Sequence, residues 1–189
     1  MTLEQSREQL IEQIRTAFRD RKKGHFLKHF LAELEFAHKR PIHSYGPEKA
    51  VAEFEKRLRG KSWEAAVEWD ELILYFTDTD YVYALSKEAF CYYLPAMLVK
   101  IVQNPEKLEF AFSLTQYMSD VLENFSVEQV NVLVAFLEFY EDFVQSQSEK
   151  YHKSLNFTLN ETDKLRSKIL AYIDSGAYKR KKGERRKAK

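Results

Sequence analysis

The sequence predicts an all-α fold, an irregular bundle of several helices built around two apolar core helices. Phe and Tyr occur 14 and 11 times, whereas the 189 residues include only five Gly and four Pro. Few turn-forming residues and many large side chains favour long helices over a fold of many strands. The two core helices are predicted over residues 86–102 and 127–147, and the other helices should pack around them.

The first core helix is apolar on every side. Between Ala89 and Val102 the only charged residue is Lys100, although 31% of all residues are charged, so other elements must enclose this helix. The run is shorter than the ~20 residues that cross a bilayer, and we therefore expect no membrane span. Pro95 lacks an N–H group and its ring clashes with the preceding turn, which predicts that the helix kinks or restarts there and leaves the Cys91 carbonyl without its helical partner.

The second core helix begins with a predicted capping box, in which the side chains of Ser126 and Gln129 each bond the backbone N–H of the other. On a helical wheel its apolar residues fill more than half of the circumference. Glu141 falls inside this apolar arc. Because burying an unpaired carboxylate is costly, an enclosed Glu141 should be protonated or paired.

The remaining elements follow from helical spacing, from capping residues and from Gly and Pro at helix ends. Residues 81–85 alternate enough for one short extended piece, but a single strand has nothing to pair with, so we predict an extended linker. Residues 148–160 are polar and predicted to be irregular. Further helices are predicted over residues 2–23, 25–38, 47–59, 63–76, 105–122 and 161–175.

A motif at the first core helix resembles the signature of an uncharacterised bacterial helical domain family. The motif is Leu85–Leu98, LSKEAFCYYLPAML, with the YYLPA box at its centre. The likeness extends to residues on both sides, namely Trp63, Leu72, Phe125–Gln129, Phe136 and Leu137. It covers roughly residues 63–139 and implies a soluble, mainly helical bacterial protein. The family is a domain of unknown function, so the resemblance implies no catalytic residues.

The charge is distributed unevenly along the chain. The formal net charge is +1, but residues 179–189 contain eight Lys or Arg and one Glu, which leaves 22 basic and 28 acidic residues in 1–178. The length fits one domain with room for a hydrophobic core. We therefore predict a single acidic helical domain over 1–178 and a disordered basic tail over 179–189.

Composition also restricts the compartment and the cofactors. Cys91 is the single cysteine, which excludes an internal disulfide and a Cys-based zinc site. The first residues are acidic and amphipathic and lack the basic and apolar regions of a secretory signal, so we expect a cytoplasmic protein. The five glycines stand alone and form no phosphate-binding loop. No cofactor is predicted.

Lys100 and Glu141 are the two charges placed inside core helices. If they form a pair, the perturbed acid would mark a candidate site. The alternative that we favour is that both side chains extend past the core and reach solvent at the helix edges.

A second candidate is a metal site. His25, His29 and Glu33 stand four residues apart and share one face of a predicted helix. This pattern lacks the acidic general base and the third ligand of a metalloprotease motif. We favour an ordinary solvated face.

Aromatic residues surround the central motif and could line a groove for a ligand or partner, because Tyr and Trp are common at interfaces and pocket rims. These residues are Trp63, Trp69, Tyr81, Tyr83, Tyr92 and Tyr93. The alternative is that they pack in the core and direct their hydroxyl groups to backbone carbonyls, with the Cys91 carbonyl as the obvious acceptor. Cys91 itself should be an inert buried thiol.

The basic tail has several possible uses. It could bind nucleic acid or anionic lipid without sequence specificity, fold back on the acidic body, or serve solubility. No base-reading motif accompanies it. Its candidate binding residues are Lys179, Arg180, Lys181, Lys182, Arg185, Arg186 and Lys187.

We found no arrangement of residues typical of a catalytic site, and the sequence favours a non-catalytic module that binds an unknown protein through its acidic or tyrosine-lined surface. An inhibitor or immunity-type binder would suit the acidic body. Two alternatives stay open. One is a nucleic-acid-associated protein that uses the tail, and the other is an enzyme or metal-binding protein that uses Glu141 and Lys100, or His25, His29 and Glu33.

Overall fold

The computed structural model describes residues 3–21, 54, 56–58, 60–73, 87–107, 112–147 and 155–176. All regular secondary structure in these ranges is helical, which confirms the all-α prediction. Within them, no helix is long and apolar enough to cross a membrane. The basic tail and the predicted helix over 25–38 lie outside the described residues.

Contacts divide the chain into two compact units. One unit comprises residues Met1–Ala17 and Thr115–Lys189, and the other comprises Phe18–Leu114. The first is discontinuous in sequence, since it combines the N-terminal segment with residues 115–189. The assignment of 1–178 to a single domain stays a prediction, because a compact unit is not by itself an independently folding domain.

The unit Phe18–Leu114 is built around α7 (Lys87–Gln103). Every residue from Ala89 to Val102 in this helix is buried, as its composition predicts. The helix packs against α4 (Trp63–Ala66) and against the 3₁₀ turns η1 (Asp70–Ile73) and η2 (Pro105–Lys107). Pro95 lies inside α7, and the helix neither stops nor restarts there.

The predicted helix over 63–76 is interrupted. Ser62 caps α4 as expected, because its hydroxyl accepts a hydrogen bond of 3.3 Å from the Ala65 N–H. After Ala66 the backbone changes to shorter 3₁₀-type bonds. At the point where the α-helix stops, the Lys100 ammonium group donates to the Val67 carbonyl at 2.8 Å.

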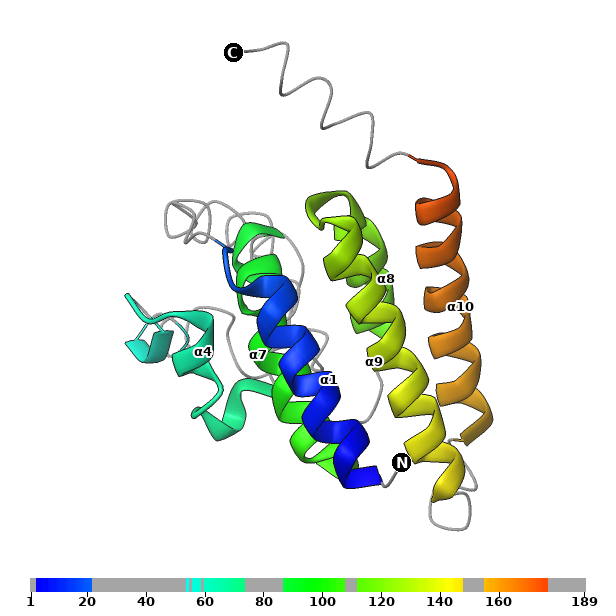
Figure 1. The fold of residues 1–189 in the computed structure, drawn as a ribbon, viewed down its shortest axis with the longest axis horizontal. Coiled ribbons are helices and arrows are strands. Elements are labelled where there is room, and N and C mark those ends of the chain that lie inside the picture. Colours follow the sequence, from blue (N-terminus) through cyan, green and yellow to red (C-terminus); the bar gives the residue numbers. More distant parts are fainter. Residues whose placement is uncertain are drawn as a thin grey trace, which may run out of the picture. The chain divides into compact units, whose positions relative to one another are not determined.

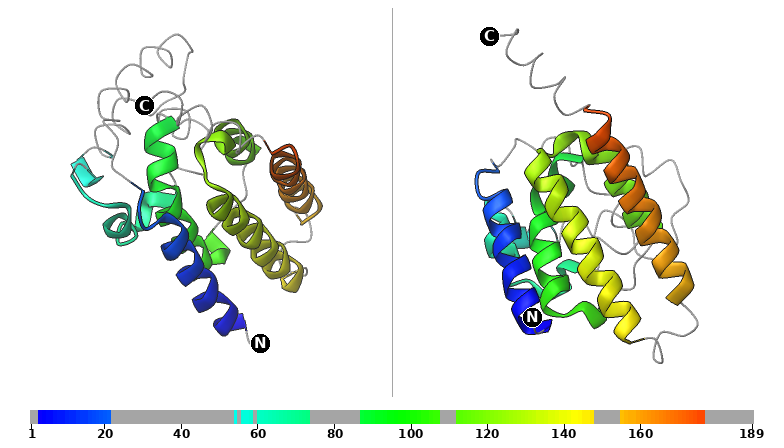
Figure 2. Two further views of the ribbon diagram at one scale, coloured as in Figure 1. Left: turned by 45° about the horizontal axis from the view of Figure 1, so that its top comes forward. Right: turned by 45° about the vertical axis from the view of Figure 1, so that its right-hand side comes forward.

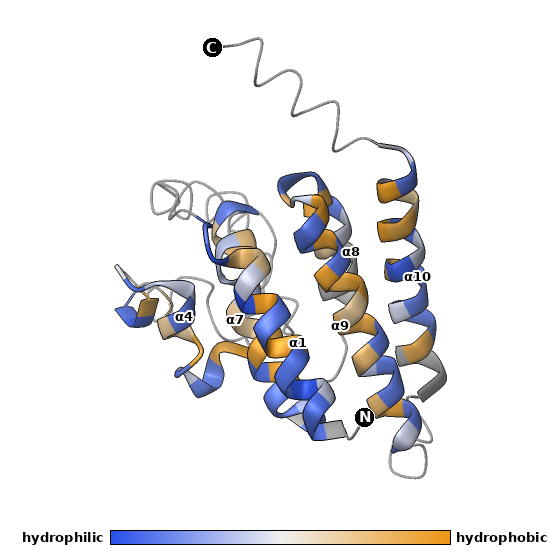
Figure 3. Cartoon of the chain, in the orientation of Figure 1, coloured by the Kyte–Doolittle hydropathy of each residue, from blue (hydrophilic) through white to orange (hydrophobic). Residues whose placement is uncertain are grey.

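The other unit contains α1 (Leu3–Phe18), most of α8 (Phe112–Val121), the 3₁₀ turn η3 (Leu122–Asn124), α9 (Val127–Ser146) and α10 (Leu155–Asp174). Helices α9 and α10 lie side by side and run in opposite directions (Figure 1), as both further views confirm (Figure 2). Hydrophobic residues recur along both helices with hydrophilic ones between them (Figure 3). This is the pattern of two amphipathic helices that bury facing stripes.

The start of α9 confirms the predicted capping box. The Ser126 hydroxyl accepts from the Gln129 N–H at 3.2 Å, and the Gln129 side-chain oxygen accepts from the Ser126 N–H at 3.1 Å. Ten residues of α9 are buried, and Glu141 is among them. The wheel therefore placed this carboxylate correctly inside the apolar arc.

Three predicted helix ends are wrong. Helix α10 begins at Leu155 and not at Glu161, because packing against α9 offsets the weak helix propensity of the Asn and Thr residues in its first turns. The helix predicted from Pro105 begins as the 3₁₀ turn η2. Helix α1 ends at Phe18 instead of continuing to Gly24, and the Arg21 N–H bonds the Phe18 carbonyl in a turn.

Candidate functional site

The described members of the predicted aromatic groove belong to the core. Trp63, Trp69, Tyr92 and Tyr93 are all buried, and Tyr93 is only 1% exposed. Tyr81 and Tyr83 lie outside the described residues. A groove lined by these side chains is therefore not present in the part of α4 and α7 that the structure describes, and the alternative prediction of core packing holds for these four residues.

Tyr93 shows how this aromatic core is organised. Its ring packs edge-on against Phe54, with ring centroids 5.3 Å apart, and against Tyr92 at 4.9 Å. Its hydroxyl donates to the Leu58 carbonyl at 3.1 Å. A tyrosine hydroxyl thus finds a backbone acceptor as predicted, but the acceptor belongs to the segment before α4 and is not the Cys91 carbonyl.

Cys91 lies beside the guanidinium group of Arg21. Burial raises the pKa of the thiol to about 12, and the charge of Arg21 only partly opposes this effect. Burial also lowers the pKa of Arg21, against the opposing influence of Cys91. At neutral pH Cys91 is a protonated thiol with little nucleophilic character, in agreement with the prediction of an inert buried side chain.

Lys100 is 7% exposed and has a partner in its own unit. Its ammonium group donates to the Val67 carbonyl at 2.8 Å and to the Asp70 carboxylate at 3.1 Å. The Asp70 side chain is largely exposed, whereas the Lys100 side chain is 9% exposed. The alternative that we favoured, in which Lys100 and Glu141 both extend past the core and reach solvent, is therefore wrong, because both residues are buried.

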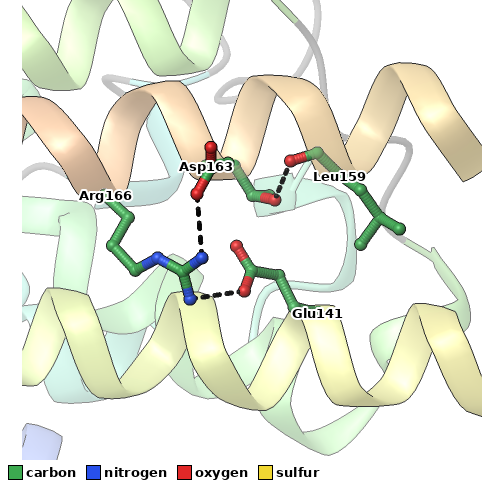
Figure 4. A network of polar contacts seen from close by, with 5 residues as sticks. Glu141, Leu159, Asp163 and Arg166 are labelled. Atoms are coloured by element: carbon green, nitrogen blue, oxygen red, sulfur yellow. Dashed lines mark hydrogen bonds and ion pairs between the residues drawn. The ribbon is translucent and has the colours of Figure 1, made fainter.

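Glu141 is 9% exposed and pairs with Arg166 of α10, not with Lys100 (Figure 4). One carboxylate oxygen accepts a hydrogen bond of 2.7 Å from Arg166 Nη1, and the other guanidinium nitrogen donates to Asp163 at 2.9 Å. The hydrogen bond that Arg166 donates to Asp163 and the negative charges nearby raise the pKa of Arg166 against the effect of desolvation. The second oxygen, Oε1, is buried and has no hydrogen-bond partner.

The prediction of a Lys100–Glu141 pair is therefore wrong. Helical spacing correctly indicated that each charge lies in a core helix, but it could not show which residues of other elements meet them. Each charge is neutralised within its own unit, Lys100 by Asp70 and Glu141 by Arg166.

The predicted metal ligands His25, His29 and Glu33 lie outside the described residues. Among the residues that the structure does describe, no three His, Cys, Asp or Glu side chains are grouped to hold a metal ion.

An open groove that the sequence did not predict lies between α1 and α9. Its volume is about 720 Å³. It is lined by Gln9, Glu12, Gln13, Thr16 and Ala17 of α1 and by Glu128, Asn131, Val132 and Ala135 of α9. We call it the α1/α9 groove. The lining residues follow helical spacing on both helices, so each helix contributes one continuous face.

Six of the nine residues that line the α1/α9 groove have polar side chains, but most of the surface exposed in the groove is apolar. Glu12 and Glu128 are exposed on opposite helices, and the Thr16 hydroxyl donates to the Glu12 carboxylate at 3.4 Å. Ala17 and Ala135 are half-buried and fill little space. The nine lining residues include two carboxylates and no Lys or Arg, so the groove has a negative charge at neutral pH.

Gln129 fixes one end of this groove. While its side-chain oxygen caps α9, its amide nitrogen donates to the Ala17 carbonyl at 3.1 Å. Ala17 is in the last turn of α1, where carbonyl groups have no partner within the helix. The Gln129 side chain thus provides hydrogen-bond partners for a backbone N–H at the start of α9 and for a backbone carbonyl at the end of α1. These two bonds set the position of one helix against the other.

We expect Gln129→Glu to lower the free energy of unfolding by about 1 kcal/mol. A Glu side chain keeps the capping box but cannot donate to the Ala17 carbonyl, so the variant removes only the bond between the helices. Urea unfolding followed by circular dichroism measures the change. Gln129→Ala removes both bonds and should cost more. A Gln129→Glu protein as stable as the wild type would mean that this bond does not hold α1 on α9.

Sequence reasoning missed this groove for a physical reason. Exposed Glu and Gln residues on an amphipathic helix look the same in sequence whether they face open solvent or a neighbouring helix. The sequence did contain one signal: α9 has four carboxylates and no Lys, Arg or His in its 20 residues. This composition predicts a helix whose exposed face is negative throughout.

Comparisons matched this chain with no protein-family model, no curated protein and no solved structure. The resemblance of the YYLPA motif to an uncharacterised bacterial family therefore stays a prediction.

Proposed function

We propose that this protein is a non-catalytic interaction module that binds a Lys- and Arg-rich segment of a partner protein in the α1/α9 groove. The observation that carries the proposal is the charge of the groove, which Glu12 of α1 and Glu128 of α9 both line, with no basic side chain among the lining residues. Opposite charge across an interface favours encounter and excludes partners of the wrong sign.

The chemistry of the lining favours a protein segment over nucleic acid. Carboxylates repel phosphate groups, whereas they accept hydrogen bonds from ammonium and guanidinium groups. Gln9, Gln13 and Asn131 add amide groups that both donate and accept, which suits the polar side chains of a peptide. The apolar surface of Val132 and the two alanines can contact the aliphatic part of a Lys or Arg side chain.

The buried charges support a binding role rather than a catalytic one. Lys100 and Glu141 were the residues on which an enzymatic alternative depended, and both are held in contacts that stabilise their own units. Lys100 bonds a backbone carbonyl where α4 ends, and Glu141 connects α9 to α10.

A labelled peptide with a basic helical face tests the proposal. The peptide Lys-Ala-Ala-Arg, repeated three times, should bind saturably, as measured by fluorescence anisotropy. Glu12→Lys with Glu128→Lys should weaken binding at least about tenfold, because like charges across an interface repel. The measurement uses the wild-type chain and a full-length tail-neutral variant, in which Lys181, Lys182, Arg185 and Arg186 are each replaced by Gln.

The matched control is Glu68→Lys with Glu71→Lys. These two exposed carboxylates lie in the other unit, so the control changes the net charge by the same amount and leaves the groove intact. Peptide binding should be nearly unchanged. If both double variants weaken binding equally, the affinity for the peptide depends only on the net charge of the protein, and the groove is not the binding site. The proposal also fails if neither the wild-type nor the tail-neutral chain binds the peptide.

A further inference from the structure

We propose that the basic tail of this chain, residues 179–189, occupies the α1/α9 groove and competes there with the partner. The inference rests on the proposed function, since it assigns a regulator to the same groove. Three observations lead to it: the level at which α10 ends, the length of chain that follows it, and the charge of the surface between that end and the groove.

The first observation is the register of α10 on α9. The two helices are antiparallel (Figure 1), and the contact between Arg166 and Glu141 fixes which residues lie at the same level. From Arg166, α10 and its terminal turn continue for ten residues to Gly176. Counting ten residues back along α9 from Glu141 leads to Asn131. Because both helices rise about 1.5 Å per residue, the described chain stops close to the level of Asn131.

Asn131 lines the α1/α9 groove, and Glu128 follows it by one turn toward the start of α9. The described chain therefore ends at the level of the groove, on the side of α9 away from α1 (Figures 1 and 2). Gly176 has a φ of +61°, a conformation typical of the residue that ends a helix. The helix is thus terminated at this level, and the chain is free to take a new direction from there.

The second observation is length. Thirteen residues follow Gly176, and an extended chain covers roughly 3.3–3.6 Å per residue, or about 45 Å in all. Packed helices lie about 8–10 Å apart, so crossing α9 to reach the groove needs roughly half of that length. The basic residues in the second half of the tail can therefore reach Glu12 without any change in α10.

The third observation is charge. At the level where the described chain ends, the exposed face of α9 presents Glu128, while Glu138 and Asp142 lie about two and three turns further along the helix. No basic residue occurs in α9. The dipoles of α1 and α9 add little net charge to this surface. The end of α1 and the start of α9 meet at Gln129, and their partial charges of about one half are opposite and largely cancel. The tail has the charge complementary to the carboxylates of the groove and of α9.

A segment tethered this close competes strongly. Short flexible linkers give effective concentrations in the millimolar range, so weak ion pairs are enough to occupy the groove when no partner is present. A partner must then displace the tail or bind with higher affinity. The tail would act as an internal competitor that sets a threshold for partner binding.

Zero-length cross-linking of the full chain tests this arrangement. A carbodiimide joins a carboxylate to a lysine amine with loss of one water, and only pairs in direct contact react efficiently. Chymotrypsin cleavage after Tyr178 releases the whole tail, which keeps the linked peptides identifiable by mass spectrometry. At low ionic strength we expect links from tail lysines to Glu12 and Glu128 in the monomer. Since the Debye length falls to about 3 Å at 1 M salt, these links should disappear there.

Specific results would overturn the inference. Links from tail lysines to Glu68 and Glu71 that are as frequent as links to Glu12 and Glu128 would indicate random encounters. Links found only in cross-linked dimers would assign the groove to the tail of a second copy. Absence of any link between the tail and the groove would likewise reject the intramolecular contact.

Peptide binding separates this inference from the proposed function. The tail-neutral variant should bind the basic peptide about tenfold more tightly than the wild type, because the competitor is weakened. Equal affinity in the two chains, with binding still lost in Glu12→Lys with Glu128→Lys, would overturn the role of the tail and leave the proposed function standing. Links from the tail to the groove without peptide binding by either chain would reject the proposed function and keep the tail contact.

Discussion

Tyr93→Ala is expected to lower the free energy of unfolding by about 3–5 kcal/mol, which is the usual cost of deleting a large buried aromatic side chain. Tyr93 is 1% exposed, and its ring contacts Phe54 and Tyr92 edge to face. The deletion removes both ring contacts and leaves a cavity beside α7. Chemical denaturation monitored by Trp fluorescence measures the loss, since Trp63 and Trp69 lie in the same unit.

Tyr93→Phe should cost only about 1 kcal/mol. The Leu58 carbonyl that accepts the Tyr93 hydroxyl also accepts the Lys61 N–H at 2.9 Å, so it keeps one partner when the hydroxyl is removed. Leu170→Ala is the control, because Leu170 is 45% exposed and should change stability by less than about 0.5 kcal/mol. If Tyr93→Phe were as destabilising as Tyr93→Ala, the hydroxyl and not the ring would dominate at this position.

The second large effect is expected at the pair between α9 and α10. Arg166→Met should destabilise the protein by about 2 kcal/mol, because it leaves the Glu141 carboxylate buried with no cation beside it. We expect less than the 3–5 kcal/mol that is typical of a fully buried pair, since the Arg166 side chain is 29% exposed and water can partly replace it.

Glu141→Leu should be much less harmful, and the double variant Glu141→Leu with Arg166→Met should be close to the wild type. Leu suits the apolar arc in which Glu141 lies, and Arg166 keeps its bond to Asp163 in the single variant. Replacing a buried ion pair by apolar residues is often neutral, whereas removing one partner is not. A double-mutant cycle from urea unfolding gives the coupling energy, with the exposed Asp163→Asn as control. Additive effects of the two substitutions would show that the pair contributes nothing of its own.

The prediction of the fold succeeded where local pattern was sufficient. A run with a single charge from Ala89 to Val102 has to be enclosed whatever surrounds it, and α7 is buried along that run. The capping box at Ser126 depends only on residues three apart, and it forms as predicted. Gly60 and Gly176, where helices were expected to stop, both have positive φ values.

The prediction of the candidate site failed where distant residues decide. No periodicity within 63–76 shows that Lys100 will engage the Val67 carbonyl and that α4 will stop at Ala66. Similarly, the weak propensity of residues 155–160 predicts irregular structure, whereas packing on α9 makes them helical. The α1/α9 groove joins two helices more than 100 residues apart through Gln129, and each helix alone shows only an ordinary polar face.

The sequence by itself determined that this chain is helical, that α7 and α9 would each bury many apolar side chains, and that Glu141 and Lys100 would lie among apolar neighbours. Those properties depend on residues a few positions apart, because hydrophobic periodicity and helix capping act over one or two turns. Only the tertiary structure decided the partners of these charges and the presence of an acidic groove between α1 and α9. Ion pairs and grooves depend on the distance between helices that are remote in sequence, and no local pattern contains that distance.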